Sequence, residues 1–558
     1  MTWSGRKDGH EWWRHAVIYQ VYIRSFADGN GDGVGDIAGI RSRLPYLKDL
    51  GVDALWINPW YPSPMADGGY DVSDYRGIAP EFGTLADATE FIDDAHMHGF
   101  RVLLDIVPNH TSSAHPWFQA ALASAPGSPA RQRYHFRPGS GPHGDQPPND
   151  WRSVFGGGGW TRITEMDGTE GEWYLHLFAP EQPDLNWEHP DVAEDFDTTL
   201  RFWFERGIDG FRIDVANSLA KAAGLPDVGV DQSVAAAMYS LADHPHWDRD
   251  EVHEVYRRWR RIANSYDPPR IFVAEALVYD PERLARYLRA DELHTAFNFE
   301  FLECPWLAEP LRRVIDATVL EHAQVAAPPT WVLSNHDVAR HVSRYARPQS
   351  TSRTRTLDDI IDKPMDLALG TRRARAAALL MLALPGCAYI YQGDELGLPE
   401  VEDLADDVLQ DPTWERSEHT ERGRDGCRVP LPWSGQVSPY GFSPPNSAKP
   451  PWLPQPDYWR GYTAQSQADD PHSMLTFYRH ALRIRRTFEA LGDGPLVWID
   501  SAPDVLHFSR PTGFECLVNL SDTPTDMARD SRILISSQPL TTRSELPSDT
   551  AVWLSTNS

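Results

Sequence analysis

The chain has few cysteines and a shortage of basic residues. Only 4 of its 558 residues are cysteine, and they are widely separated, which excludes a disulfide framework and a CxxC zinc site. Lys and Arg number 52 against 80 Asp and Glu, so the formal net charge is −28. Binding to nucleic acid or to an anionic membrane requires clustered positive charge, and this balance argues against both partners.

Long apolar runs are also missing. No uninterrupted apolar stretch reaches the roughly 18 residues of a membrane span, and the longest candidate, 376–390, is interrupted by Pro385 and Gly386. The first residues contain no apolar run typical of a secretory signal. Together with the low cysteine content, this predicts a cytoplasmic protein.

What is present is a repeated unit of a short apolar strand, a polar loop and an amphipathic helix. Two examples of the helices are expected after Thr84 and from Pro190 to about Gly207. Strands are expected at 16–22, 52–58, 101–107, 209–215, 270–275, 294–300, 330–334 and 388–392. Eight such units predict an α/β protein, a (β/α)₈ TIM barrel. A doubly wound open sheet is the alternative, but the Gly-rich first turn is missing.

Two further domains are predicted because some intervals are too long for simple loops. The barrel would comprise residues 1–110 and 178–486. A small inserted domain after the third strand would span 111–177, which is rich in Gly, Pro, His and Trp. Residues 487–558 lack a helical period and contain alternating segments, which predicts a C-terminal antiparallel β-domain.

Polar and charged residues follow several of the predicted strands. In a (β/α)₈ barrel the carboxyl ends of the strands form one rim, where active sites lie. This rim would collect Asp105, Asn109, His110, Arg212, Asp214, Glu275, His336 and Asp337. A purely structural protein has no reason to gather so many groups that are costly to desolvate.

Two of these carboxylates have different surroundings in the sequence. Arg212 and Asp214 are two apart on a strand, so their side chains share a face, and the guanidinium favours the ionised carboxylate that a nucleophile needs. Glu275 has apolar neighbours on both sides, which predicts an apolar site where the carboxyl keeps its proton, as a general acid requires. This division of roles is typical of a glycosidase.

Four ordered motifs carry a resemblance to a known family. DIVPNH (105–110), GFRIDVA (210–216), VAEA (273–276) and SNHD (334–337) resemble the signature regions of glycoside hydrolase family 13, the α-amylase family. QPDLNW (182–187) resembles a fifth region of its α-glucosidase and oligo-1,6-glucosidase branch. The resemblance implies Asp214 as nucleophile, Glu275 as acid and base, and Asp337 as the third carboxylate, with His110 and His336 binding hydroxyls of the same sugar.

Two other segments resemble the loops that close the sugar pocket in exo-acting members. In DGGYDVSDY (67–75), Asp67 matches the carboxylate that binds the terminal sugar and Tyr70 its stacking platform. GRDGCRVPLPW (423–433) places Arg428 as the ionic partner of Asp67, and Phe155 matches an aromatic residue of the neighbouring subsite. A pocket closed by this ion pair would accept one terminal glucose.

DGNGDGVGD (28–36) has the pattern of a calcium loop. Asp28, Asn30, Asp32, the Val34 carbonyl and Asp36 stand at the odd ligand positions. An EF-hand would need a glutamate at position 39, which is Gly, so that interpretation fails. The resemblance to glucosidases implies instead a structural Ca²⁺, or Mg²⁺, at this loop, and no organic cofactor.

The sequence therefore predicts a retaining α-glucosidase that releases glucose from short α-glucosides, with α-1,4 linkages favoured and α-1,6 linkages tolerated. One alternative is a transglycosylase or isomerase of the same fold, such as a trehalose synthase, although members of that type tend to carry Tyr in place of Trp187. A second alternative is a non-catalytic sugar-binding or scaffold relative. Such relatives typically lose catalytic carboxylates, and all three are present here.

Overall fold

The computed structural model describes residues 11–229, 244–488, 490–527 and 531–556. Eight parallel strands form the central sheet, in the order β10–β11–β1–β2–β3–β7–β8–β9. They are β1 Val17–Val21, β2 Ala54–Ile57, β3 Arg101–Ile106, β7 Gly210–Ile213, β8 Ile271–Ala274, β9 Thr295–Ala296, β10 Thr330–Val332 and β11 Cys387–Tyr391. Each lies within one of the eight predicted strands except for Cys387, one residue earlier than expected, so the predicted barrel is confirmed.

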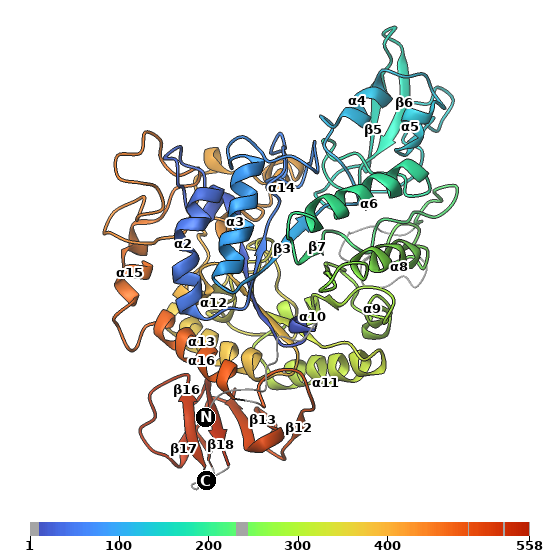
Figure 1. The fold of residues 1–558 in the computed structure, drawn as a ribbon. Helices are drawn as coiled ribbons and strands as arrows, with labels where there is room; N and C mark the ends of the chain where they lie inside the picture. The colour runs from blue at the N-terminus through green and yellow to red at the C-terminus, as the bar shows by residue number, and fades with distance from the viewer. Residues whose placement is uncertain (1–10, 230–243, 489, 528–530, 557–558) are drawn as a thin grey trace.

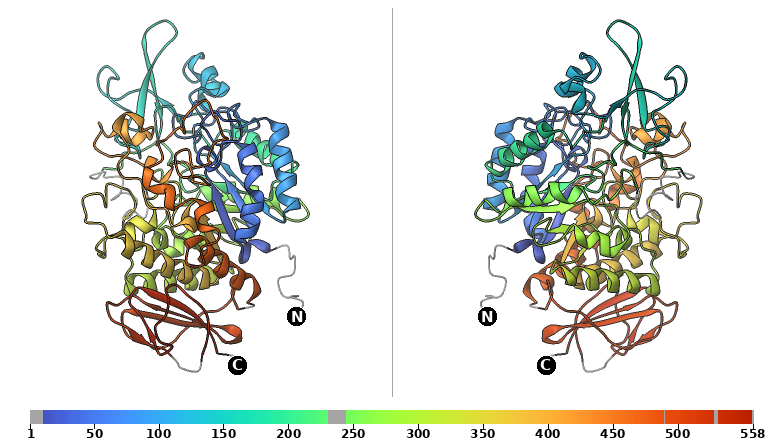
Figure 2. Two further views of the ribbon diagram at one scale, coloured as in Figure 1. Left: turned by 90° about the vertical axis from the view of Figure 1, so that its left-hand side faces the viewer. Right: turned by 90° about the vertical axis from the view of Figure 1, so that its right-hand side faces the viewer.

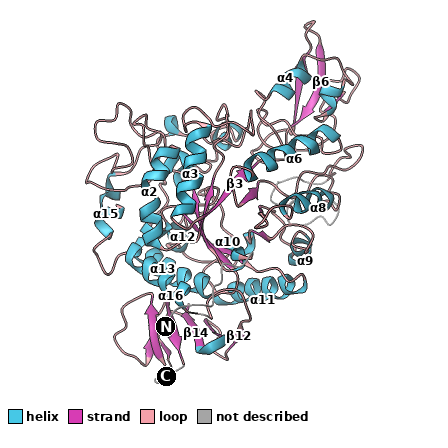
Figure 3. Cartoon of the chain, in the orientation of Figure 1, coloured by secondary structure: helices cyan, strands magenta, loops and turns pink. Residues whose placement is uncertain are grey.

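Helices surround these strands, as Figures 1 and 3 show. The longer ones are α2 Ile37–Leu50, α3 Leu85–Met97, α6 Pro190–Phe204, α8 Val252–Ala263, α11 Ala308–Gln324, α13 Leu367–Ala383 and α16 Met474–Thr487. Thr84 and Asp87 form a capping box at the start of α3, and Pro190 occupies the first turn of α6, both as expected. No helix in the described ranges has the length and apolar character to cross a membrane.

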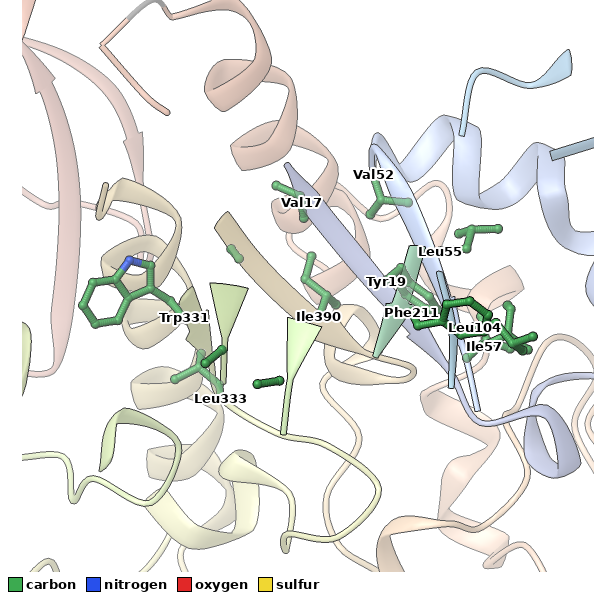
Figure 4. Close-up of a cluster of buried hydrophobic side chains, with 14 of the residues drawn as sticks. Val17, Tyr19, Val52, Leu55, Ile57, Leu104, Phe211, Trp331, Leu333 and Ile390 are labelled. Carbon is green, nitrogen blue, oxygen red and sulfur yellow. The ribbon is translucent and has the colours of Figure 1, made fainter. Parts of the chain in front are cut away.

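Successive side chains along the barrel strands alternate between two apolar clusters. One set of side chains packs outward against the helices: Val17, Tyr19, Leu55, Ile57, Leu104, Phe211, Trp331 and Ile390 (Figure 4). The intervening positions form a second cluster inside the barrel: Ile18, Trp56, Leu103, Val273, Val332 and Tyr389. Since successive strand residues face opposite sides, the same alternation turns Asp105 and Arg212 inward.

The sixth barrel strand is shorter than the sequence predicts. Residues 294–300 were expected to form it, but β9 covers only Thr295–Ala296 and a short helix, α10 Phe299–Leu302, follows. The Asn298 side chain accepts a hydrogen bond from the Phe301 amide at 2.9 Å. This side-chain cap starts the helix and ends the strand.

A small sheet of its own is inserted between β3 and α6. It consists of β4 Phe136–Arg137, β5 Trp160–Thr164 and β6 Glu170–Leu175, accompanied by the helices α4 Pro116–Leu122 and α5 Pro129–Gln132. In Figure 1 this insertion projects from one end of the molecule.

The antiparallel C-terminal sheet lies at the opposite end (Figure 2). Its order is β12–β13–β14–β18–β16, and β15 pairs with β17 beside it. The bounds are β12 Val497–Trp498, β13 Val505–Arg510, β14 Phe514–Asn519, β15 Thr525–Asp526, β16 Arg532–Ser536, β17 Glu545–Leu546 and β18 Thr550–Ser555. Trp553 of β18 donates to the Leu379 carbonyl of α13 at 3.1 Å, which ties the sheet to the barrel helices.

Candidate active site

One buried guanidinium holds three carboxylates at the centre of the barrel rim. Arg212 Nη1 donates to Asp105 Oδ1 and to Asp214 Oδ1, each at 2.8 Å, and its Nη2 lies 2.8 Å from Glu275 Oε1. The Arg212 side chain is 1% exposed. Asp214 and Glu275 follow β7 and β8, which are neighbours in the sheet. The two predicted catalytic carboxylates therefore share one partner in one cavity.

Burial and mutual repulsion control the protonation of this pair. Burial, and then the charge of Glu275, raise the pKa of Asp214 well above its ordinary value, while Arg212 opposes the rise. Burial likewise raises the pKa of Asp105 to about 6. Two carboxyls this close do not both ionise readily, so the pair keeps one proton to a higher pH than an isolated aspartate would. The expectation that Arg212 by itself keeps Asp214 ionised is therefore wrong: the pair supplies a nucleophile and an acid only when its one proton lies on Glu275.

The expected apolar surroundings of Glu275 are wrong. Besides the ion pair with Arg212, Glu275 Oε2 accepts a hydrogen bond from the Val215 amide at 3.1 Å. Two of its apolar sequence neighbours point elsewhere: Phe272 packs toward the helices and Val273 into the barrel. Val215 has φ of 46°, a strained value for a β-branched residue, and this left-handed turn directs its amide at Glu275.

Asp337 lies between two arginines. Arg424 Nη1 donates to Asp337 Oδ1 at 3.0 Å and Arg428 Nη2 donates to the same oxygen at 2.9 Å. Burial acts to raise the pKa of Asp337, but the positive charges of Arg424 and Arg428 outweigh it and hold the pKa well below its ordinary value. Asp337 is therefore an ionised hydrogen-bond acceptor at neutral pH.

The predicted pairing of Asp67 with Arg428 is wrong. Asp67 Oδ1 accepts from Arg424 Nη2 at 2.6 Å, whereas Arg428 donates to Asp337 and, through Nε, to the His336 carbonyl at 2.8 Å. The two arginines flank the short helical turn η4 Asp425–Cys427. Their order along the chain does not determine which one reaches Asp67.

Both predicted histidines are buried, and an aromatic ring stacks on one of them, His336. Burial lowers the pKa of His110 to about 4 and holds that of His336 well below its ordinary value, so both rings are neutral at pH 7. The Tyr70 ring stacks on His336 with centroids 5.3 Å apart, and its hydroxyl donates to Asp105 at 2.9 Å. Phe155 lies beside Arg424, whose guanidinium carbon is 4.9 Å from the ring centroid.

These groups surround one cavity of about 650 Å³. The predicted residues that line it are Asp67, Tyr70, His110, Phe155, Asp214, Glu275, His336 and Asp337. Arg212 and Arg428 stand behind them and hold the carboxylates in place. The volume is sufficient for a small ligand, and the Asp67–Arg424 pair lies beside Asp337.

Four supporting residues were not predicted. Gln182 Nε2 donates to Asp67 Oδ2 at 3.1 Å, and Lys221 Nζ lies 2.7 Å from Asp184 and 2.8 Å from Asn109. Besides Gln182 and Lys221, the unpredicted residues are Arg424 and Asp411, which accepts a hydrogen bond from the Nε of Arg424. Gln182 and Asp184 belong to QPDLNW and Arg424 to GRDGCR, so the motifs contained the signal. Asp411 has no motif that marks it.

The side chains of the predicted calcium loop bind backbone amides. Asp28 accepts from the amide of Gly33 at 2.9 Å, and Asp36 accepts from that of Gly39 at 2.6 Å as the N-cap of α2. Asp32 accepts from the Val34 amide at 3.0 Å. Among the described residues no group of three or more His, Cys, Asp or Glu side chains is arranged to hold a metal. The donors suit Ca²⁺ chemically, but binding would require several of these hydrogen bonds to be exchanged.

The fold and the site together define a class of protein. A (β/α)₈ barrel with an aspartate and a glutamate sharing one arginine, a third ionised carboxylate and neutral histidines at the same cavity is an arrangement for cleaving glycosidic bonds. All three carboxylates are present and face one cavity, which does not fit a non-catalytic relative.

Comparison with known proteins identifies the family. Residues 20–494 match the model of the α-amylase catalytic domain. A probable α-glucosidase of Rhizobium meliloti is 39% identical over 92% of this chain and 90% of its own. An oligo-1,6-glucosidase of Parageobacillus thermoglucosidasius is 33% identical over 92% and 90%. A trehalulose synthase from Pseudomonas mesoacidophila is 29% identical, with a TM-score of 0.83 over 98% of this chain and 100% of that one. The chain belongs to the α-amylase family, glycoside hydrolase family 13, and is a glycoside hydrolase.

Proposed function

We propose that this enzyme is an exo-acting, retaining α-glucosidase that releases glucose from the non-reducing ends of short α-glucosides. The observation that carries this proposal is the shared Arg212 guanidinium, 2.8 Å from both Asp214 and Glu275, because it brings both carboxyls to one scissile bond. The Asp67–Arg424 pair supports exo-action, since a pocket closed beside Asp337 leaves room for one terminal sugar.

The reaction would proceed in two displacements. In the first, Asp214 attacks the anomeric carbon while Glu275 donates its proton to the glycosidic oxygen, so the C–O bond breaks and the leaving sugar departs as an alcohol. In the second, the Glu275 carboxylate removes a proton from water, and the resulting attack on the anomeric carbon releases Asp214 and α-glucose. Asp337 and the neutral His110 and His336 would bind sugar hydroxyls throughout.

The linkage preference that we propose is α-1,4 with tolerance of α-1,6. The name of the oligo-1,6-glucosidase relative favours the second linkage, whereas the preference for the first is the expectation from the sequence. A glucosyl-transferring or isomerising activity is the second candidate, because a trehalulose synthase shares the fold over nearly its whole length. In that case a sugar rather than water would attack the intermediate.

A substrate panel tests these alternatives. Maltose, isomaltose, trehalose, sucrose and p-nitrophenyl α-glucoside are each incubated with the enzyme, and NMR follows the anomer of the first product. We expect α-glucose first. Initial β-glucose would contradict the retaining mechanism, and a disaccharide isomer as main product would replace hydrolysis by isomerisation.

We also propose a structural Ca²⁺ at the loop 28–36 and a cytoplasmic location. The oxygen-only donor set supports the first. The four cysteines are buried and free, as is usual in a reducing compartment. Cell fractionation that recovers the activity outside the cytoplasm would contradict the location.

A further inference from the structure

An arginine that no motif marks faces the catalytic cavity. Arg355 lies on the loop between α12 His341–Tyr345 and α13, and it lines the cavity together with Phe299 and Glu303. Its side chain is 33% exposed, and its one ionic partner in the described part of the chain is Glu303, 3.8 Å from Nη1. That separation exceeds hydrogen-bond length. A guanidinium with five N–H donors therefore presents unused donors to the cavity.

The backbone at Arg355 is fixed close to the catalytic residues. Its amide donates to Asp359 Oδ2 at 2.8 Å, and its carbonyl accepts from the Ala339 amide at 2.9 Å. Ala339 is two residues after Asp337, so the loop is tied to the third carboxylate. Both bonds involve the main chain, and the side chain is not needed to hold the loop.

The charge of Arg355 interacts with the catalytic carboxylates. Burial acts to lower the pKa of Arg355, but the charges of Glu303, Tyr279, Asp337 and Glu275 raise it overall. The neighbouring Arg353 is different, because it pairs with Glu300 and its guanidinium carbon lies 4.4 Å from the Tyr279 ring centroid. Arg355 has the same kinds of partner at longer distances, Glu303 at 3.8 Å and the Phe299 ring centroid at 5.8 Å.

We infer that Arg355 binds the sugar that leaves, or that accepts the glucosyl group, by donating hydrogen bonds to its hydroxyls. This inference rests on the proposed glucosidase function and assigns a residue to the side of the linkage opposite the terminal glucose. A neutral sugar fits better than an anionic group because Asp358, Asp359 and Glu421 also line the cavity. Their negative charge would repel a phosphate or carboxylate.

The test compares two leaving groups. kcat and KM are measured for the best disaccharide of the panel and for p-nitrophenyl α-glucoside, whose leaving group has no sugar hydroxyls. A hydrogen bond from a charged donor changes affinity by roughly 10- to 100-fold. In Arg355→Ala we expect kcat/KM for the disaccharide to fall by about this 10- to 100-fold factor. The kcat/KM for p-nitrophenyl α-glucoside should fall far less. Arg355→Lys, which retains charged donors, should give an intermediate loss for the disaccharide.

Arg372→Ala is the matched control. Arg372 on α13 is 38% exposed and, among the described residues, pairs only with Asp549, 3.8 Å away. It does not line the cavity. This variant should keep both activities. Equal losses on both substrates in Arg355→Ala, or no loss on the disaccharide in folded Arg355→Ala and Arg355→Lys, would overturn the inference. A wild-type enzyme that cleaves neither substrate would instead contradict the proposed function.

Discussion

Replacing Arg424 by methionine tests how the closed end of the cavity works. In the structure Arg424 Nη2 is 2.6 Å from Asp67, Nη1 is 3.0 Å from Asp337, and Nε contacts Asp411. Burial raises the pKa of Asp67, and Arg424 is the first of the charges that oppose the rise. Without that guanidinium the pKa of Asp67 must rise further, and Asp67 becomes protonated at a higher pH.

The expected loss follows from the strength of one hydrogen bond. A bond from a sugar hydroxyl to an ionised acceptor contributes about 1.5–3 kcal/mol, and one to a neutral acceptor about 0.5–1.5 kcal/mol. The difference of about 1–1.5 kcal/mol corresponds to a roughly 5- to 12-fold fall in kcat/KM. Because protonation causes this loss, it should be larger at low pH and diminish as the pH rises through the raised pKa of Asp67.

The assay is the pH profile of kcat/KM for p-nitrophenyl α-glucoside in the wild type and in Arg424→Met. Arg372→Met, at a residue that does not line the cavity, is the control. Circular dichroism and thermal unfolding establish that each variant is folded. A loss that is the same at every pH from 5 to 8, or no loss at all, would refute the role of Arg424 in keeping Asp67 ionised.

Two further predictions concern stability. Burial raises the pKa of Glu400 from 4.5 to about 7, so its contribution to stability is present below pH 4.5 and is lost as the pH rises through 7. Glu400→Gln, which still accepts from the Arg340 amide, should therefore be more stable than the wild type at pH 8 by about 3 kcal/mol, or about 2–3 °C in Tm, and similar near pH 5; equal Tm values at both pH values would contradict this. At a Ca²⁺ concentration of about 100 Kd, binding at the loop 28–36 should stabilise the enzyme by about 2.7 kcal/mol relative to EDTA. Asp32→Ala should abolish that increase, and a Tm that is insensitive to Ca²⁺ would exclude the metal.

The barrel was predictable because its signals are local. Short apolar strands, a helix cap such as Thr84 and a helix-starting residue such as Pro190 arise from neighbouring residues. The order of strands in the barrel follows the order in the chain. The sixth strand is shorter than predicted because Asn298 caps the helix α10. The apolar pattern of residues 294–300 does not reveal that the backbone turns into a helix there.

The site was less predictable where contacts are distant in sequence. Asp214 and Glu275 come from strands that pair, so the strand pattern brings them together. The choice between Arg424 and Arg428 depends on how a loop more than 350 residues from Asp67 folds over the rim. The surroundings of Glu275 were misjudged because the sequence neighbours of a strand residue point to other faces, while Arg212 and the Val215 amide reach it through space.

Trapping the covalent intermediate tests the central claim most directly. 5-Fluoro-α-D-glucosyl fluoride is a substrate analogue whose glycosyl-enzyme forms faster than it hydrolyses, and mass spectrometry of peptides locates the added glycosyl group. We predict a single fluoroglucosyl group on the peptide that contains Asp214, and none in Asp214→Asn. A label on any other carboxylate, or steady turnover by the Asp214→Asn enzyme, would contradict the assignment of Asp214 as the nucleophile.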